Sequence, residues 1–282
     1  MAEDAEEQPV FETSTGPVRV ITAASLFDGH DAAINVMRRL IQSSGAEVIH
    51  LGHDRSAKDV VDCAVQEDAH AVALTSYQGG HVEYFTYIRQ LLDEAGCEHV
   101  RIFGGGGGTI TPPEIRELHQ AGISKIYSPD DGRTMGLMGM IHHLMGIAGE
   151  VDLISDERMK DLDGPITASD MAKVGLLLTL SESADEVTFR QTLETCRSST
   201  DEVPVIGFTG TGGAGKSSLL DELMLRIQRD NPGKKVCLLC VDPTRKRTGG
   251  ALLGDRIRMN SLSNNDLYTV SYTHLRAHET HE

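Results

Sequence analysis

Five short apolar segments alternate with helix-like segments over the first half of the chain, and this alternation constrains the fold most. Each apolar segment is four or five residues long, and the intervals carry apolar residues at helical spacing. The five segments are Val18–Thr22, Glu47–Leu51, Ala71–Thr75, Val100–Phe103 and Lys125–Ser128. Strands separated by helices pair in parallel, because a parallel connection needs a long crossover. The pattern predicts a flavodoxin-like, doubly wound α/β domain over residues 18–149.

The second half of the chain begins with a different pattern. Residues 150–200 have no strand-like segment and contain two helix-like stretches, which predicts a helical connector. A second α/β unit is expected over residues 201–268. Its expected elements are a strand at Val203–Phe208, a helix from Lys216 to about Arg229 and a strand through Cys240.

Charge and composition exclude several classes of function. The chain has 26 Lys and Arg against 42 Asp and Glu, a net charge of −16, so it lacks the basic surface that nucleic acid or anionic lipid requires. No apolar run approaches the ~18 residues of a membrane span. Residues 1–17 are acidic, which predicts a disordered tail rather than a targeting signal. The five scattered cysteines favour a reducing compartment, and we expect a cytoplasmic protein.

The segment Gly210-Thr-Gly-Gly-Ala-Gly-Lys-Ser217 matches the P-loop pattern Gly-x-x-x-x-Gly-Lys-Ser, between an expected strand and an expected helix. Backbone N–H groups of such a loop surround phosphates, and the helix N-terminus adds a favourable dipole. The lysine reaches the β- and γ-phosphates, and the serine hydroxyl binds Mg²⁺. A glycine-rich turn without a ligand is the alternative. The expected nucleotide-binding residues are Gly210, Gly212, Gly213, Ala214, Gly215, Lys216, Ser217 and Ser218.

Asp242 ends the strand that follows the P-loop helix. A carboxylate at that position can bind Mg²⁺ directly or through water, so Ser217 and Asp242 are the expected Mg²⁺ ligands. The alternative is a carboxylate that caps the next turn of the chain.

Three polar or glycine-rich loops follow strands of the first domain. Asp28-Gly29-His30 follows the first strand, Ser76-Tyr77-Gln78 the third, and Gly104–Gly108 the fourth. Ligands of doubly wound domains bind at the carboxyl ends of the strands, where the strand order reverses. A neutral imidazole on a loop is a natural metal ligand, and a nearby carboxylate can bind its second ring nitrogen. We therefore expect a ligand site in which His30 binds a metal and Asp28 orients the imidazole of His30.

The motifs Asp28-Gly-His30, Ser76-Tyr-Gln-Gly-Gly-His81 and Gly104–Gly108 resemble the cobalamin-binding domain of adenosylcobalamin-dependent acyl-CoA mutases. The family pattern is Asp-x-His-x-x-Gly, and this sequence has Ala33 at the final glycine. A P-loop follows the connector, and then come Val241-Asp-Pro and Thr248-Gly-Gly-Ala-Leu-Leu-Gly-Asp-Arg-Ile-Arg258. This order is similar to the fused isobutyryl-CoA mutases, in which a G-protein chaperone lies between the cobalamin and substrate domains. The resemblance covers about Val18 to Tyr268.

The resemblance implies that His30 is the lower axial cobalt ligand, in place of the cofactor's own base, and that Asp28 orients it. It implies adenosylcobalamin, GTP and Mg²⁺ as ligands, a GTPase that gates cofactor loading, and a homodimeric parent enzyme. That enzyme is an isomerase that interconverts isobutyryl-CoA and butyryl-CoA by radical rearrangement. The implied cofactor-binding residues are His30, Asp28, Gly29, Ser76, Gln78, Gly104, Gly105, Gly106 and Gly107.

The sequence departs from the resemblance beyond Leu267. The 282 residues contain neither the Asn-Lys-x-Asp motif that reads guanine nor the substrate barrel of the family. Residues 269–282 resemble translated sequencing-adapter read-through, and we interpret them as an artefactual tail. We therefore expect residues 201–268 to be the N-terminal part of a P-loop GTPase domain, with acyl-CoA bound only through a missing substrate domain. No catalytic residue is assigned, and neither mutase activity nor sustained GTP hydrolysis is expected.

Two other classes of function fit the same residues. One is a non-catalytic cobalamin carrier or sensor joined to a nucleotide switch. The other is a receiver-like or flavodoxin-like signalling domain, in which Asp28 and His30 are ordinary loop residues. The visible spectrum of added cobalamin distinguishes a cobalamin-binding protein from a signalling domain, because only the cobalamin-binding hypotheses predict a change in that spectrum.

Overall fold

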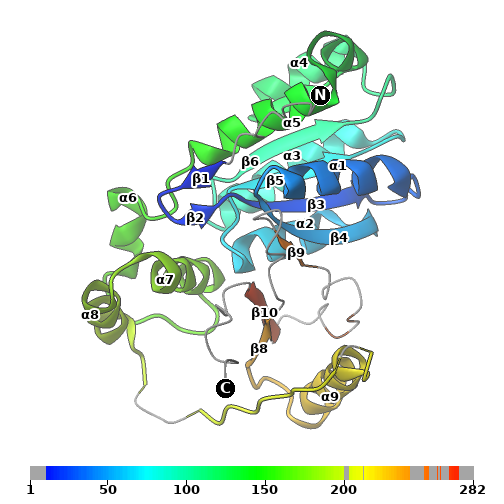
Figure 1. Cartoon of the computed structure of the whole chain (residues 1–282). Helices are drawn as coiled ribbons and strands as arrows, with labels where there is room; N and C mark the ends of the chain where they lie inside the picture. The colour runs from blue at the N-terminus through cyan, green and yellow to red at the C-terminus, as the bar shows by residue number, and fades with distance from the viewer. Residues whose placement is uncertain are drawn as a thin grey trace, which may run out of the picture.

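The alternating apolar segments of the first half form a parallel sheet, as their spacing predicts (Figure 1). The computed structural model describes residues 11–199, 203–211, 213–241, 251–253, 259, 261 and 267–272. The strands are β3 (Arg19–Ser25), β4 (Glu47–Arg55), β5 (Ala71–Thr75), β6 (Arg101–Gly105), β7 (Lys125–Tyr127) and β9 (Ala251–Leu253). Their order is β7-β6-β5-β3-β4-β9, with every pair parallel. The first five strands confirm the flavodoxin-like order, with the reversal between β3 and β5.

Helices cover both faces of this sheet, because alternate strand residues point to opposite sides. One face packs on α1 (Asp31–Ser43) and α5 (Pro129–Gly149). The other packs on α2 (Ala57–Gln66), α3 (His81–Glu94) and α4 (Pro112–Gln120). The doubly wound arrangement predicted from the sequence is confirmed.

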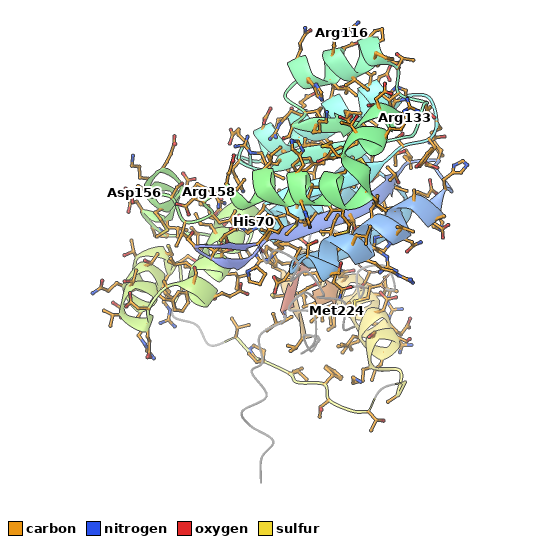
Figure 2. All side chains as sticks on the ribbon, turned by 45° about the horizontal axis from the view of Figure 1, so that its top comes forward. His70, Arg116, Arg133, Asp156, Arg158 and Met224 are labelled. Atoms are coloured by element: carbon orange, nitrogen blue, oxygen red, sulfur yellow. The ribbon has the colours of Figure 1, made fainter. Side chains whose placement is uncertain are left out.

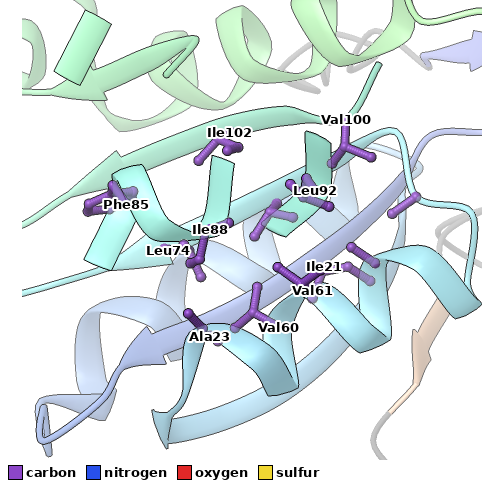
Figure 3. Packing of buried hydrophobic residues seen from close by; sticks show 14 of the residues in the cluster. Ile21, Ala23, Val60, Val61, Leu74, Phe85, Ile88, Leu92, Val100 and Ile102 are labelled. Atoms are coloured by element: carbon purple, nitrogen blue, oxygen red, sulfur yellow. The ribbon is translucent and has the colours of Figure 1, made fainter. Parts of the chain in front are cut away.

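The core beneath α2 and α3 is closely packed (Figure 3). Val60 of α2, Ile88 and Leu92 of α3 and Ile21 of β3 belong to this cluster, and all four residues are 0% exposed. Burial of one such side chain contributes about 1.5–3 kcal/mol, so this face holds the sheet and its loops in place. The loops at the carboxyl ends of β3, β5 and β6 therefore rise from a rigid base.

The connector contains short helices, as its sequence predicts. They are α6 (Asp156–Met159), the 3₁₀ turn η1 (Lys160–Leu162), α7 (Met171–Ser183) and α8 (Glu186–Cys196). Leu162, Leu176, Leu180 and Cys196 form a small core among them. No helix in the described ranges is long and apolar enough to cross a membrane.

A buried ionic cluster joins the connector to the first domain. Arg158 Nη2 lies 2.6 Å from Asp68 Oδ1, and the hydroxyl of Thr179 donates to Asp68 Oδ2 at 2.8 Å. Asp68 is 3% exposed and follows α2 at the amino-terminal end of β5. Figure 2 labels Arg158 and His70 close together on this side of the sheet. The connector is therefore anchored at the end of the sheet opposite to the predicted ligand loops.

The nucleotide-binding half differs from its predicted form. The helix α9 (Lys216–Asp230) and the strand β8 (Val236–Val241) are present, and β8 pairs in parallel with β10 (Leu267–Tyr272). The predicted strand at Val203–Phe208 is wrong, because this segment is irregular. Val203, Val205 and Ile206 are 78%, 94% and 73% exposed. Strand-forming residues need a neighbouring strand, and among the described residues none pairs with this segment.

Part of the predicted acidic tail is ordered in the structure. Residues 11–17 contain β1 (Glu12–Thr13) and β2 (Gly16–Pro17), which pair antiparallel. Gly16 adopts φ +105°, and the hydroxyl of Thr13 donates to its carbonyl oxygen at 2.9 Å. This tight turn explains why a polar segment forms a hairpin. Residues 1–10 lie outside the described residues.

Two buried histidines, His50 and His70, and the partly buried His99 are expected to make the free energy of unfolding fall with acid. Burial, reinforced by nearby arginines, lowers the pKa of His50 to about 4, of His70 to about 3 and of His99 to about 4. The unfolded chain, with histidine pKa values near 6.5, binds more protons in this range than the folded chain. The contribution of the neutral histidines to the free energy of unfolding is therefore complete above about pH 6.5. It is lost as the pH falls toward 4, at about 1.4 kcal/mol per pH unit for each histidine.

Urea unfolding between pH 7 and pH 5 measures this loss. His70→Gln serves as the matched variant, since His70 Nδ1 accepts the backbone N–H of Arg19 at 3.0 Å in its neutral form. The variant should show a shallower pH dependence than the natural sequence. A free energy of unfolding that stays constant over this range would contradict the prediction.

Candidate functional site

The loop between β3 and α1 holds Asp28 and His30 in one hydrogen-bonded unit. The Asp28 side chain is fully buried, whereas the side chain of His30 is 74% exposed. Asp28 Oδ1 accepts the backbone N–H of His30 at 2.9 Å and lies 2.8 Å from His30 Nδ1. Its Oδ2 accepts the backbone N–H of Tyr77 at 2.7 Å. The carboxylate thus joins the loops after β3 and β5.

The ionised carboxylate of Asp28 determines which ring nitrogen of the neutral His30 imidazole carries the proton. Burial alone would raise the pKa of Asp28, but the hydrogen bonds from Tyr77 and His30 outweigh it and lower the pKa. An ionised carboxylate only accepts, so the proton of the neutral imidazole lies on Nδ1. Nε2 then carries the free lone pair, and it has no hydrogen-bond partner in the described part of the chain. The pair is arranged as a metal ligand with its orienting carboxylate.

A cavity of about 450 Å³ lies beside this loop, between α1 and α5 and next to the carboxyl ends of β5 and β6. Tyr77 lines it, and its ring centroid is 5.5 Å from that of His30. Most of the lining is apolar and includes Met37, Phe103, Leu137, Met140, Ile141 and Leu144. The cavity therefore suits a flat, largely apolar group next to the exposed histidine.

Thr75 supplies a polar atom to this cavity. Its side chain lines the cavity at the end of β5, the residue is 7% exposed, and its Oγ1 has no hydrogen-bond partner among the described residues. A buried hydroxyl without a partner is costly, so it is a natural contact for a ligand. Thr75 is not part of any motif that the sequence singles out. Its signal was the alternation of Ala71, Ala73 and Thr75, which places all three on the same face of the sheet.

The predicted residues of the second loop connect loops rather than line the cavity. Ser76 is 1% exposed, and its hydroxyl oxygen accepts from Ser25 at 2.9 Å. Gln78 Nε2 donates to the carbonyl oxygen of Leu26. Gly29 has open space where a Cβ would lie. The structure therefore brings all four predicted residues together. Asp28 and His30 form the pair described above, whereas Ser76 and Gln78 hold the neighbouring loops in place.

The glycine run has distinct roles at successive positions. A Cβ on Gly104 would lie 2.4 Å from the Phe85 ring, so this glycine allows core packing against α3. A Cβ on Gly106 would lie 1.9 Å from the carbonyl oxygen of Ser76, so this glycine lets two loops touch. Gly104, Gly105, Gly106 and Gly107 all line the cavity. Their backbone forms one wall of it.

The P-loop precedes α9, which begins at Lys216. Gly213 and Gly215 adopt φ +79° and +81°, the left-handed conformation that brings the chain into the helix. Lys216 Nζ donates to the carbonyl oxygens of Gly210 and Thr211 at 2.8 and 3.0 Å. The ammonium group therefore folds back onto the loop itself. Ala214, Ser217 and Ser218 lie in or next to the first turn, and the predicted residues Gly212 and Asp242 lie outside the described residues.

No group of three or more His, Cys, Asp or Glu side chains that could hold a metal ion occurs in the described part of the chain. The Cys237–Cys240 segment is strand β8, with Cys237 exposed and Cys240 buried. The Cys-x-x-Cys spacing of this pair, which also occurs in redox and zinc sites, here reflects two positions of one strand. A site at His30 would use one protein ligand.

Comparisons with known proteins assign both halves. Residues 18–130 match the family model "B12 binding domain", and residues 174–275 match "Methylmalonyl Co-A mutase-associated GTPase MeaB". Over 263 residues the chain is 49% identical to a fused isobutyryl-CoA mutase of Geobacillus kaustophilus, covering 90% of this chain and 24% of that protein. It is also 49% identical over 281 residues to the corresponding protein of Nocardia farcinica, covering 99% of this chain and 25% of that protein. The chain is homologous to the fused isobutyryl-CoA mutases over a B12-binding part and a MeaB-type GTPase part.

Homology to the fused isobutyryl-CoA mutases extends over both domains in the order that the sequence predicts, B12-binding and then GTPase. The chain spans about a quarter of the length of these relatives. Its first part is also 34% identical over 115 residues to the 2-hydroxyisobutanoyl-CoA mutase small subunit of Aquincola tertiaricarbonis, covering 40% of this chain and 82% of that protein. The matches to a B12-binding domain and to a MeaB-type GTPase imply cobalamin and GTP as ligands.

Proposed function

We propose that this chain binds adenosylcobalamin through His30 and Mg²⁺-GTP through its P-loop, as part of an enzyme that interconverts isobutyryl-CoA and butyryl-CoA. The observation that carries the proposal is the Asp28–His30 pair beside the cavity. A buried carboxylate fixes the imidazole through Nδ1 and leaves Nε2 exposed with a free lone pair. When bound, adenosylcobalamin supplies a cobalt–carbon bond for radical chemistry.

The residues of the cavity fit the base that His30 would displace from cobalt. A displaced benzimidazole is a flat, mostly apolar ring, and its freed ring nitrogen accepts one hydrogen bond. The cavity offers about 450 Å³, an apolar lining and the unpartnered hydroxyl of Thr75. Thr75 would donate to that nitrogen, and the backbone of Gly105 and Gly106 would lie against the ring. Ser76 and Gln78 would act indirectly, by holding the loops in place.

The nucleotide site is proposed from the P-loop. Lys216 would exchange its contacts with the carbonyl oxygens of Gly210 and Thr211 for the phosphates. The hydroxyl of Ser217 would bind Mg²⁺, with Asp242 as the second proposed ligand. The α9 N-terminus has no acidic side chain in its first turn, which favours a bound anion.

A titration of the purified chain with cobalamin tests the proposal. A shift of the visible absorption to that of cobalamin with its own base displaced, together with binding of a fluorescent GTP analogue, is the expected result. Lys216→Ala should weaken nucleotide binding at least about tenfold, since it removes the cation that reaches the phosphates. Lys234→Ala, an exposed lysine beyond α9, is the matched control. An unchanged cobalamin spectrum would refute the cobalamin assignment.

Thr75→Val should lower the affinity for cobalamin about fivefold while the fold remains as stable or becomes more stable. The affinity falls by the ~1 kcal/mol that one neutral hydrogen bond contributes. Stability is maintained because valine has the same shape and the buried hydroxyl has no partner in the unliganded chain. Calorimetric titration measures the affinity. Cobinamide, a corrinoid without the nucleotide base, is the control ligand, and an equal loss of affinity for it would contradict the role given to Thr75.

A further inference from the structure

Two neighbouring loops of the His30 site contain non-glycine residues in the left-handed backbone conformation. Phe27 has φ +62° at the end of β3, and Asp54 has φ +57° at the end of β4. This region is disfavoured for bulky side chains, whereas aspartate tolerates it better. The Phe27 conformation thus persists only if other contacts hold it.

Hydrogen bonds, rather than packing, hold the turn at Phe27. Its side chain is 80% exposed, so the ring is not fixed by a core. Asp54 Oδ1 accepts the backbone N–H of Phe27 at 2.6 Å. On the other side, the carbonyl oxygen of Leu26 accepts from Gln78 Nε2. The turn is therefore held by one contact from the end of β4 and one from the loop after β5.

This turn determines how Asp28 enters the protein. The backbone N–H of Asp28 donates to the carbonyl oxygen of Ser25 at 3.0 Å, which closes the turn around Phe27. Asp28 then reaches inward, where its carboxylate binds His30 through two hydrogen bonds. A change in the backbone of Phe27 would move the carboxylate that orients the imidazole.

We propose that Asp54 is a positioning residue for His30, acting through the left-handed turn at Phe27. Asp54 holds the backbone N–H of Phe27, Phe27 directs Asp28 inward, and Asp28 orients the imidazole. Asp54 is not among the residues that line the cavity, and in the described part of the chain its side chain accepts from Phe27 rather than from His30. The inference rests on the proposed role of His30 as the cobalt ligand.

Three variants of Asp54 separate its hydrogen bond from its backbone conformation. Asp54→Ala removes the acceptor and disfavours the left-handed conformation. Asp54→Gly also removes the acceptor but tolerates that conformation. Asp54→Asn keeps both the acceptor oxygen and the tolerance. We expect cobalamin affinity to fall about five- to tenfold in the first two and to be retained in Asp54→Asn.

Electron paramagnetic resonance of bound cob(II)alamin measures the ligation directly. In protein labelled with ¹⁵N-histidine, a protein imidazole on cobalt gives doublet splitting, whereas the unlabelled base of the cofactor gives triplet splitting. Asp54→Ala and Asp54→Gly should show a mixture of the two signals, and Asp54→Asn should show the doublet alone. Thermal unfolding should be nearly unchanged in Asp54→Asn, since Asp54 is an exposed residue, and slightly lowered in Asp54→Ala, where the left-handed backbone is unfavourable.

The outcomes test the role of His30 as cobalt ligand and the role of Asp54 as positioning residue separately. A triplet from the unmodified chain would overturn the assignment of His30 as cobalt ligand. A doublet from the unmodified chain and an equally pure doublet with unchanged affinity in Asp54→Ala would overturn the role of Asp54 alone. Loss of the doublet in Asp54→Asn as well as in Asp54→Ala would also contradict it, because the acceptor is retained.

Discussion

Replacement of His30 by alanine is expected to abolish histidine-ligated cobalamin and to lower its affinity at least about 100-fold. The imidazole supplies the single exposed lone pair that the site offers to cobalt. The fold should be little affected, because the His30 side chain is 74% exposed. Asp28 loses its contact with the ring but keeps the backbone N–H donors of Tyr77 and His30. The carboxylate therefore remains satisfied in the variant.

Absorption spectra of the cobalamin complex give the readout. In the unmodified chain the cofactor base should be displaced, and in His30→Ala any residual complex should show the base bound to cobalt. His53→Ala is the matched control, because His53 is an exposed histidine on neighbouring β4. A displaced-base spectrum that survives in His30→Ala would refute the ligand assignment.

Gly106→Ala should both destabilise the first domain and impair cobalamin binding. The added Cβ would lie 1.9 Å from the carbonyl oxygen of Ser76 and 3.0 Å from its carbonyl carbon. Because the obstacle is backbone, the loops after β5 and β6 must separate. We expect a loss of about 3 kcal/mol in the free energy of unfolding, at the upper end for overpacked sites, and at least a tenfold loss of affinity.

Gly108, two residues further along the same loop, supplies the control for this prediction. Gly108 has no atom within 4 Å of the position that a Cβ would occupy, so Gly108→Ala should leave stability and binding nearly unchanged. Urea unfolding and calorimetric titration measure the two quantities. Equal effects at Gly106 and Gly108 would indicate that loop flexibility, rather than close approach of the two loops, explains the glycine run.

The periodic patterns of the first domain were sufficient to predict its fold. Apolar segments of four or five residues were long enough to mark the strands, and Ala71–Thr75 coincides with β5. The prediction of a strand at Val203–Phe208 was wrong, since residue composition describes how well side chains fit a sheet and not whether a partner strand is present. Pairing depends on residues distant in the sequence.

The candidate site was predictable only in part for the same reason. Asp28 and His30 are two residues apart, so their hydrogen bond could be inferred from spacing. The contact between Asp54 and Phe27 joins two loops, and the clash that excludes a side chain at Gly106 comes from Ser76. Such contacts depend on strand register. The free hydroxyl of Thr75 could be identified only once its neighbours were known.

The anchor at Asp68 also indicates where the chain can be divided. Arg158 and Thr179 bind Asp68, so α6 and α7 are joined to the first domain by buried charge. A polypeptide that ends near residue 199 would retain this anchor and the small core of α7 and α8. One that ends at residue 149 would leave Asp68 buried without its cation, a costly arrangement. Recombinant versions of the first domain should therefore keep residues 150–199 for stability.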